Sequence, residues 1–247
     1  MPIPAIREAI GTAGEAALAA FTVTLLLTPL VRLVAVRFGW VARPVGDRWG
    51  RRVVARLGGV AMFAGFATAL LGWMPWDRTV LSLLVGAALV FVLGLADDLR
   101  RMPPYTKLIA QLLIGCVVVL SGVRFPFTQW MWLAIPVSIM WLILVMNAFN
   151  LLDNMDGLAA GVGAIAAFFC AWHAGLTGQW HLTTVAAIVG GVCLGFLRFN
   201  FPPAKIFMGD SGSHLLGFSL ATLAMLGSGA YSTRLVSVLA VPTLVLA

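Results

Sequence analysis

The sequence predicts an all-α, polytopic membrane protein with about nine transmembrane helices. Of its 247 residues, 61% are hydrophobic and only 10% are charged, whereas about a quarter of the residues in a soluble domain are charged. The mean hydropathy is +1.01. The segments apolar enough to cross a bilayer are residues 16–36, 57–74, 79–96, 105–123, 130–149, 157–175, 181–198, 211–228 and 234–247. We therefore expect residues 1–247 to form a single transmembrane domain.

The residues that bound these segments agree with helices. Pro103–Pro104 leads into the fourth segment, and proline is well suited to the first turn of a helix. Pro202–Pro203 breaks the chain after the seventh segment, and Ser211 or Ser213 is expected to cap the eighth. The ninth segment reaches the end of the sequence without a polar flank. We therefore expect the chain to be part of a longer protein whose remaining spans and last cytosolic loop are missing.

Basic residues predict that the N-terminus lies outside. In that orientation only four of the 16 Lys and Arg residues lie on the outer side, namely Arg7, Arg78, Arg124 and Arg234. The others lie in the inner loops, which are the longer ones, and cytosolic loops are enriched in positive charge. The net charge of +7 therefore reports the topology, and it does not indicate nucleic acid as a partner.

The acidic residues predict a site on the cytosolic face. Most of the nine Asp and Glu residues lie at or next to the inner ends of the spans: Asp97, Asp98, Asp153, Asp156 and Asp210. Ionisable groups at membrane depth are costly, so they suggest function by default. Carboxylates that converge on one face repel each other unless a cation is present. Mg²⁺ or Mn²⁺, which bind oxygen ligands, is therefore the expected cofactor.

The first acidic motif is A-D-D-L-R-R, residues 96–101. It allows a solvated helix end in which the carboxylates pair with Arg100 and Arg101. It also allows adjacent carboxylates that handle a metal or a proton beside Lys107, whose ammonium is a good partner for phosphate. Gln111 follows Lys107 by four residues, so both lie on one face of the helix near its cytosolic end.

The second motif is N-A-F-N-L-L-D-N-M-D-G, residues 147–157. Its polar side chains fall at every third position, which advances 300° per step on an α-helix of about 3.6 residues per turn. The four side chains cannot all face one way, so we expect a helix end that fans them around a pocket. Gly157 then allows the chain to start the next span.

The third motif is F-M-G-D-S-G-S, residues 207–213. One interpretation is a flexible turn with an N-cap, which is common in loops. The other is an aspartate, Asp210, presented at a helix N-terminus, where backbone N–H groups and the helix dipole favour anionic ligands. His214 lies just past this turn, near the expected site, although the sequence does not favour a contact with substrate.

Together these motifs resemble the polyprenyl-phosphate N-acetylhexosamine-1-phosphate transferase family, which includes the phospho-MurNAc-pentapeptide translocase. The matching stretches are Leu93–Arg101 with Lys107–Gln111, then Asn147–Gly161, then Asn200–Phe218, and more weakly Arg43–Gly59. The resemblance implies a Mg²⁺-dependent enzyme of the bacterial inner (plasma) membrane that starts the synthesis of O-antigen, teichoic acid or a related polymer. Its partners would be a UDP-HexNAc, undecaprenyl phosphate and the lipid bilayer, and a homodimer is left open.

The resemblance also implies a role for individual residues. Asp210 would hold the metal with Asn150 as a second ligand. Asp97 and Asp98 would serve the lipid phosphate, one of them as proton acceptor, and Lys107 would bind phosphate. The residues expected to bind the rest of the substrate are Asn147, Asp153, Asp156, Asn200 and Phe207, with Phe207 stacking on uracil.

Three alternatives stay open at this point. The stretch L-L-G-F-S-L-A, residues 215–221, favours UDP-GlcNAc over UDP-MurNAc-pentapeptide, which is the alternative substrate. The carboxylates could instead serve a cation-coupled transporter, although an internal repeat, typical of transporters, is not evident. The chain could also be an inactive scaffold. The first loop has Ala42 and Gly50 where the family usually has Asp and His, and a His-rich loop would lie beyond Ala247.

Overall fold

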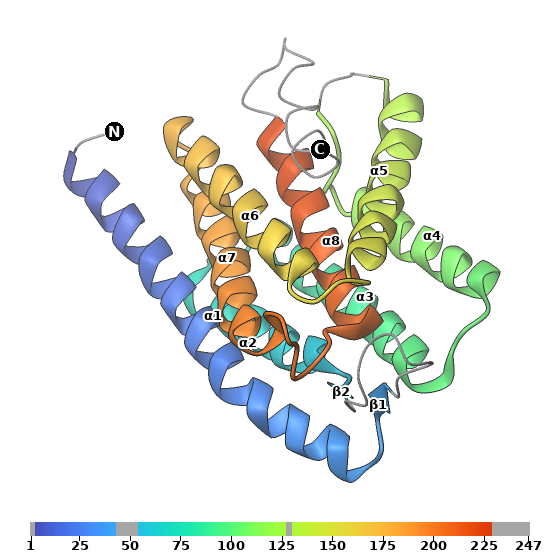
Figure 1. Cartoon of the computed structure of the whole chain (residues 1–247). Coiled ribbons are helices and arrows are strands. Elements are labelled where there is room, and N and C mark those ends of the chain that lie inside the picture. Colours follow the sequence, from blue (N-terminus) through green and yellow to red (C-terminus); the bar gives the residue numbers. More distant parts are fainter. Residues whose placement is uncertain (1–2, 43–53, 127–129, 229–247) are drawn as a thin grey trace.

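The computed structural model describes residues 3–42, 54–126 and 130–228, and it is almost entirely helical (Figure 1). The helices are α1 (Ile3–Arg37), α2 (Gly58–Trp73), α3 (Arg78–Arg100), α4 (Pro104–Leu120), α5 (Met131–Leu152), α6 (Leu158–Leu176), α7 (Trp180–Asn200) and α8 (Gly209–Gly227). Each of the first eight predicted spans corresponds to one of these helices. The largest difference is in α1, which begins at Ile3 where the prediction began at residue 16.

Within the part of the chain that the structure describes, α1, α3, α5, α6 and α7 are long and apolar enough to cross a membrane. The helices α2 and α4 are apolar but shorter. This architecture agrees with an all-α, multi-pass membrane protein. The ninth predicted span, residues 234–247, lies outside the described residues, and the orientation of the N-terminus stays a prediction.

Helix α8 forms the centre of the bundle. It packs against α3, α5, α2, α6 and α7, and Figure 1 shows it between the α6–α7 pair and α5. Almost all of its residues from Ser211 to Met225 are buried, including Ser213, Ser219 and Thr222. Because its neighbours are protein and not lipid, α8 can carry polar side chains that bond within the fold.

Two glycines allow α8 to approach its neighbours closely. A Cβ atom on Gly94 of α3 would overlap the carbonyl of Asp210 and the Cα of Ser211. A Cβ atom on Gly217 of α8 would overlap the backbone of Met146 on α5. Small residues of this kind are typical of helix interfaces inside membranes, where packing is a main source of stability.

A short hairpin that the sequence did not predict lies at the end of the first inner loop. Strand β1 (Val41–Ala42) pairs antiparallel with β2 (Val54–Ala55), and Ala55 forms a parallel bridge to Ile206. Next to it, the N–H of Phe207 donates to Ala55 at 2.9 Å and its carbonyl accepts from Gly58 at 2.9 Å. The all-α prediction did not include this strand pair, in which the loop before α8 finds backbone partners. Of the divergent first-loop positions, Ala42 lies in β1 and Gly50 lies outside the described residues.

Candidate active site

The candidate site is built at the ends of α3, α4, α5 and α8 that the sequence places on the cytosolic side. Its centre is the ammonium of Lys107 on α4. Lys107 Nζ donates to Asp97 Oδ2 at 2.9 Å and to Asp210 Oδ2. The Lys107 and Asp97 side chains are only 14% and 15% exposed. The structure therefore joins the first and third sequence motifs in one ion-pair cluster.

The connection from α3 to α4 is shaped by Asp97. Its Oδ1 atom accepts a hydrogen bond from the N–H of Met102 at 2.5 Å, and its carbonyl accepts from Arg101 at 2.8 Å. Both arginines of the motif are exposed. Within the described residues, Asp97 forms its ion pair with Lys107, and neither Arg100 nor Arg101 forms an ion pair with a carboxylate of the motif. The interpretation as a locally neutralised helix end is therefore wrong.

Asp98 holds the N-terminus of α8. It accepts hydrogen bonds from the N–H of Asp210 at 2.8 Å, the N–H of Ser211 at 3.0 Å and the hydroxyl of Ser211 at 2.7 Å. A carboxylate at this position satisfies free N–H groups and complements the helix dipole. Gly209 has a φ of +71°, and a Cβ atom there would overlap the Asp98 carboxylate. The predicted cap by Ser211 or Ser213 is therefore wrong, because the cap comes from α3.

Asn150 lies beside Asp210; the resemblance implied these two residues as metal ligands, and that role stays a prediction. Its Nδ2 atom donates to Asp210 Oδ1 at 2.9 Å and to Ser213 Oγ at 3.1 Å. Across residues 3–42, 54–126 and 130–228, no group of three or more His, Cys, Asp and Glu side chains is close enough to hold a metal by itself. A metal at this site would therefore need further ligands besides these side chains.

The two aspartates of the second motif, Asp153 and Asp156, have different surroundings. Burial, together with repulsion from the Asp210 and Asp98 carboxylates, raises the pKa of Asp153 to about 8. Asp156 is exposed, and its Oδ2 atom accepts from the N–H of Ala204 at 2.9 Å. Asp153 thus faces the acidic cluster, whereas Asp156 ties its loop to the segment that leads into α8. The predicted fan of side chains agrees with these different directions.

Asn200 and Phe207 lie at the junction of the same loops. Asn200 is buried, and its amide accepts from the N–H of Gly157 at 3.1 Å and donates to the carbonyl of Ile206 at 3.0 Å. Its amide is therefore used inside the protein, and a direct contact with substrate stays a prediction. Phe207 is half-buried and forms hydrogen bonds through its backbone. Its role in stacking on uracil stays a prediction.

A polar group one helical turn deeper completes the arrangement. Asn147 Nδ2 donates to Gln111 Oε1 at 2.9 Å, and Gln111 Nε2 lies 2.8 Å from His214 Nε2. Two spacings in the sequence are consistent with this cluster. Gln111 follows Lys107 by four residues, and His214 follows Asp210 by four, but the contact between the two helices is not visible in sequence spacing.

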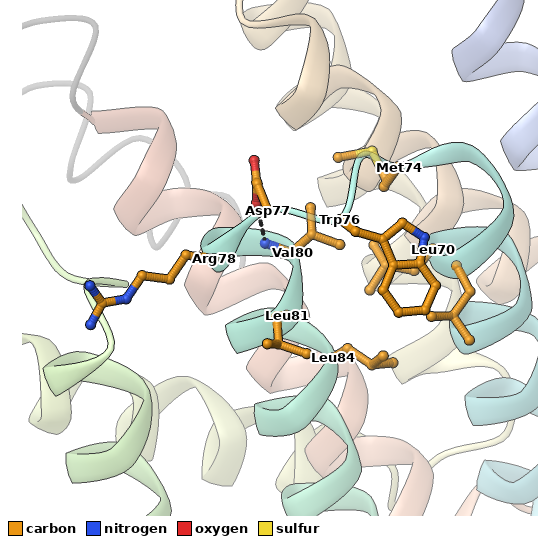
Figure 2. A pocket seen from close by; sticks show the side chains of 9 residues that line it. Leu70, Met74, Trp76, Asp77, Arg78, Val80, Leu81 and Leu84 are labelled. Atoms are coloured by element: carbon orange, nitrogen blue, oxygen red, sulfur yellow. Dashed lines mark hydrogen bonds between the residues drawn. The ribbon is translucent and has the colours of Figure 1, made fainter.

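An apolar cavity of about 210 Å³ lies at the opposite end of α3, between α2 and α3 (Figure 2). Its lining includes Leu70, Met74, Trp76 and Leu84, and Figure 2 shows Arg78 extending away from these side chains. None of the predicted site residues lines this cavity, so the polar cluster and the cavity are separate features.

Comparison with known proteins identifies the family of the chain. The model of glycosyl transferase family 4 matches residues 80–228, which contain all the predicted site residues. A probable undecaprenyl-phosphate N-acetylglucosaminyl 1-phosphate transferase of Bacillus subtilis is 34% identical over 213 residues, which are 82% of this chain and 60% of that protein.

Two further relatives show the breadth of the similarity. A decaprenyl-phosphate N-acetylglucosaminephosphotransferase of Mycolicibacterium smegmatis is 32% identical, over 87% of this chain and 60% of that protein. A phospho-N-acetylmuramoyl-pentapeptide-transferase of Moorella thermoacetica is 33% identical, over 84% of this chain and 73% of that protein. The chain thus spans 60% of the length of the first two relatives. The resemblance found in the three motifs is confirmed, and the chain belongs to glycosyl transferase family 4.

Proposed function

We propose that this protein transfers a HexNAc-1-phosphate from a UDP-sugar to undecaprenyl phosphate in the bacterial inner membrane. The observation that carries the proposal is the Lys107 ammonium, held between Asp97 and Asp210 where α3, α4 and α8 meet. Phosphoryl transfer depends mainly on positioning and on neutralising charge, and this cluster offers fixed charges of both signs. The relatives from Bacillus and Mycolicibacterium, named for N-acetylglucosamine phosphate transfer, support the same chemistry here.

The donor set fits Mg²⁺. Mg²⁺ is usually bound by one or two carboxylates together with water and substrate phosphates, and not by a cage of protein ligands. Asp210 would hold it through its carboxylate, and Asn150 through Oδ1, the amide atom that is not used in its two hydrogen bonds. Burial first, and then the Asp210 and Asp98 carboxylates, raise the pKa of Asp153, and a cation would offset the negative charge of those carboxylates. When bound, Mg²⁺ would supply Lewis-acid neutralisation of the reacting phosphates.

Lys107 is placed to orient a phosphate. An ammonium group carries three N–H donors, and within the described residues two of them have partners, Asp97 and Asp210. The third can donate to a phosphate oxygen. The pairing with two carboxylates also restricts the conformations of the lysine side chain, which reduces the conformational entropy lost when substrate binds.

The carboxylates are placed to position groups more than to abstract a proton. Both oxygens of Asp97 and of Asp98 already accept hydrogen bonds. A lipid phosphate monoester has a second pKa of about 6 and is largely ionised near neutral pH, so a strong base is not required. An oxygen of the lipid phosphate would bond to the sugar-bearing phosphorus, and the bond from that phosphorus to the oxygen of UMP would break. The products are lipid-pyrophosphate-sugar and UMP.

The nucleotide is expected to lie toward the loops after α5 and α7. Asp153, Asp156 and Phe207 are grouped there, and Asn200 holds the two loops together. Phe207 would stack on uracil. The Asn147 amide lies one turn deeper, against Gln111, so its contact with substrate is the least supported of these assignments.

Release of UMP from a UDP-sugar in the presence of undecaprenyl phosphate tests the proposal. With the full-length protein we expect release that requires Mg²⁺ and that falls by roughly a hundredfold or more in Asp210→Asn and Lys107→Met, because fixed charges at the reacting phosphates are lost. Ser219→Ala, a buried change on α8 away from the site, should retain the wild-type rate. Unchanged rates in both site variants would contradict the site assignment.

Comparison of two donors tests the sugar. We expect UDP-GlcNAc to be used in preference to UDP-MurNAc-pentapeptide. The opposite preference would move the protein to the branch of the Moorella relative and keep the chemistry. Transport of a cation without sugar transfer would instead support the transporter alternative. The absence of both activities in the full-length protein would support an inactive scaffold.

A further inference from the structure

Two polar layers, each made of one residue from α4, α5 and α8, are stacked one helical turn apart. The site layer consists of Lys107, Asn150 and Asp210, which are joined by hydrogen bonds. The support layer consists of Gln111, Asn147 and His214. Each support residue is three or four positions from the site residue on its own helix, so the two layers share one face of each helix.

The contacts of the support layer define its hydrogen-bond direction. The Gln111 amide nitrogen can only donate, so His214 Nε2, 2.8 Å away, must accept. The proton of the neutral imidazole is then on Nδ1, which donates to the carbonyl of Asp210 at 2.6 Å. Asn147 completes the chain by donating to Gln111 Oε1 at 2.9 Å. The chain therefore runs from α5 through α4 to the backbone of the residue that carries the central carboxylate.

Burial makes this chain costly to disturb. Gln111 is 1% exposed and His214 is 0% exposed, and a buried polar group without a partner loses free energy. Rotation of α4 or α8 about its own axis would separate Gln111 from His214 and break the bond between Gln111 Nε2 and His214 Nε2. The same rotation would carry Lys107 away from Asp210. The support layer is thus coupled by geometry to the register of the site layer.

We propose that Gln111, His214 and Asn147 are positioning residues for the reaction, which act by holding Lys107, Asp210 and Asn150 in register. This inference rests on the proposed function, because it assigns a purpose to the layer in that reaction. It gives Asn147 a task in support of the site in place of a contact with substrate. His214 acts on Asp210 through the backbone carbonyl.

The kinetic test uses Gln111→Leu and His214→Leu. Leucine fills most of the volume of either side chain but cannot form the hydrogen bonds of the support layer. We expect kcat to fall by about ten- to a hundredfold, since small displacements of reacting groups have effects of this size, while KM for the UDP-sugar changes by less than about twofold, because the layer does not touch the nucleotide. His214→Gln presents an acceptor oxygen to Gln111 and should recover most of kcat. Ser219→Ala, whose hydroxyl bonds within α8 to Leu215 at 2.8 Å, is the matched control.

A spectroscopic measurement tests the layer without turnover. In ¹⁵N NMR spectra of protein labelled at histidine, His214 should show a protonated Nδ1 and an unprotonated Nε2. The Nε2 resonance should shift in Gln111→Leu, and the Nδ1 resonance should shift when Mg²⁺ is added, because its acceptor is the carbonyl of Asp210. A protonated Nε2, or no response to either change, would overturn the inference. If the leucine variants fold poorly, the tautomer of His214 and its response to Mg²⁺ are still measured in the wild type. The resonances of His214 are then assigned by their disappearance in His214→Gln.

The outcomes separate the two proposals. If the wild type does not release UMP while the histidine shows the expected tautomer and responses, the proposed function fails and the layer stands as a device that holds Asp210. If the wild type is active and both leucine variants retain kcat, the positioning role fails and the proposed function stands. A fall in kcat that His214→Gln does not recover would also count against the inference, since the bond to Gln111 would then not be the cause.

Discussion

At the start of α3, Asp77 accepts a hydrogen bond from the N–H of Val80, three residues along the same helix, at 2.8 Å. At the other end of α3, Asp98 accepts bonds from Ser211, which is 113 residues away in the sequence. The first aspartate completes its own helix, and the second completes a different one. The same type of residue therefore caps its own helix at one end of α3 and caps a distant helix, α8, at the other end.

The surroundings differ in the same way. The end near Asp77 borders an apolar cavity whose polar neighbour Arg78 extends away from it (Figure 2). The end near Asp98 joins α4, α5 and α8 through part-buried polar contacts. Polar groups that bond to each other across helices specify the arrangement of those helices, whereas a terminal cap specifies only where one helix begins. Function is therefore expected at the end whose contacts are not local.

The largest expected difference between the two ends comes from removing Asp98. Asp98→Ala leaves two backbone N–H groups and the Ser211 hydroxyl without their acceptor. We expect the free energy of unfolding to fall by about 3 kcal/mol, because each unsatisfied buried donor costs about 1–3 kcal/mol, and sugar-phosphate transfer to be lost. Denaturant unfolding in detergent and UMP release measure both effects. Wild-type stability in the variant would show that Asp98 does not hold α8.

A second prediction concerns the close approach of α3 to α8. Gly94→Ala places a methyl group against the backbone of Asp210 and Ser211, and we expect a loss of about 2 kcal/mol from overpacking. Gly72→Ala on α2 is the matched control, because a Cβ atom there meets nothing within 4 Å. It should stabilise the protein by up to about 1 kcal/mol through helix propensity. The two thermal midpoints should move in opposite directions, and equal shifts would contradict the packing of α3 on α8.

The acidic end should also respond to pH through Asp153. Its pKa is about 8 in the folded protein, against an ordinary value near 4 in the unfolded chain. The folded state therefore binds more protons between these values, and the free energy of unfolding falls as the pH rises from about 4 to about 8. In Asp153→Asn this dependence should be weaker, and the variant should be more stable than the wild type at pH 8. Equal slopes of thermal midpoint against pH in the two proteins would contradict the prediction.

Most of the helical architecture could be predicted from sequence because it depends on local pattern. The apolar runs between polar flanks defined each of the eight described helices, and proline marked the start of α4. The start of α1 was missed, because the segment before residue 16 is helical although less apolar. The strand pair β1–β2 was missed because each strand has only two residues, and the bridge from Ala55 to Ile206 was missed because it joins segments far apart in the sequence.

The residues of the site could be predicted from the sequence, but the contacts between them could not. Residue type and depth singled out Asp97, Lys107 and Asp210, which the structure brings together. The cap formed by Asp98 on α8 requires knowledge that α3 and α8 are neighbours, which sequence spacing does not contain. The same holds for the bond between Gln111 and His214. A single sequence shows which groups are costly to bury, and the tertiary structure decides which partner satisfies each of them.

The smallest expected effect belongs to the other end of α3. Asp77→Ala removes the side chain that accepts from Val80, and loss of an N-cap costs about 1 kcal/mol. We expect the thermal midpoint to fall slightly and UMP release to remain at the wild-type rate, because Asp77 has no contact with the site layer. Asp77→Ser keeps a capping oxygen and should recover the stability. A loss of activity in Asp77→Ala comparable to that in Asp98→Ala would mean that the two ends of α3 are coupled along the helix, and the contrast between a local and a long-range aspartate would then fail.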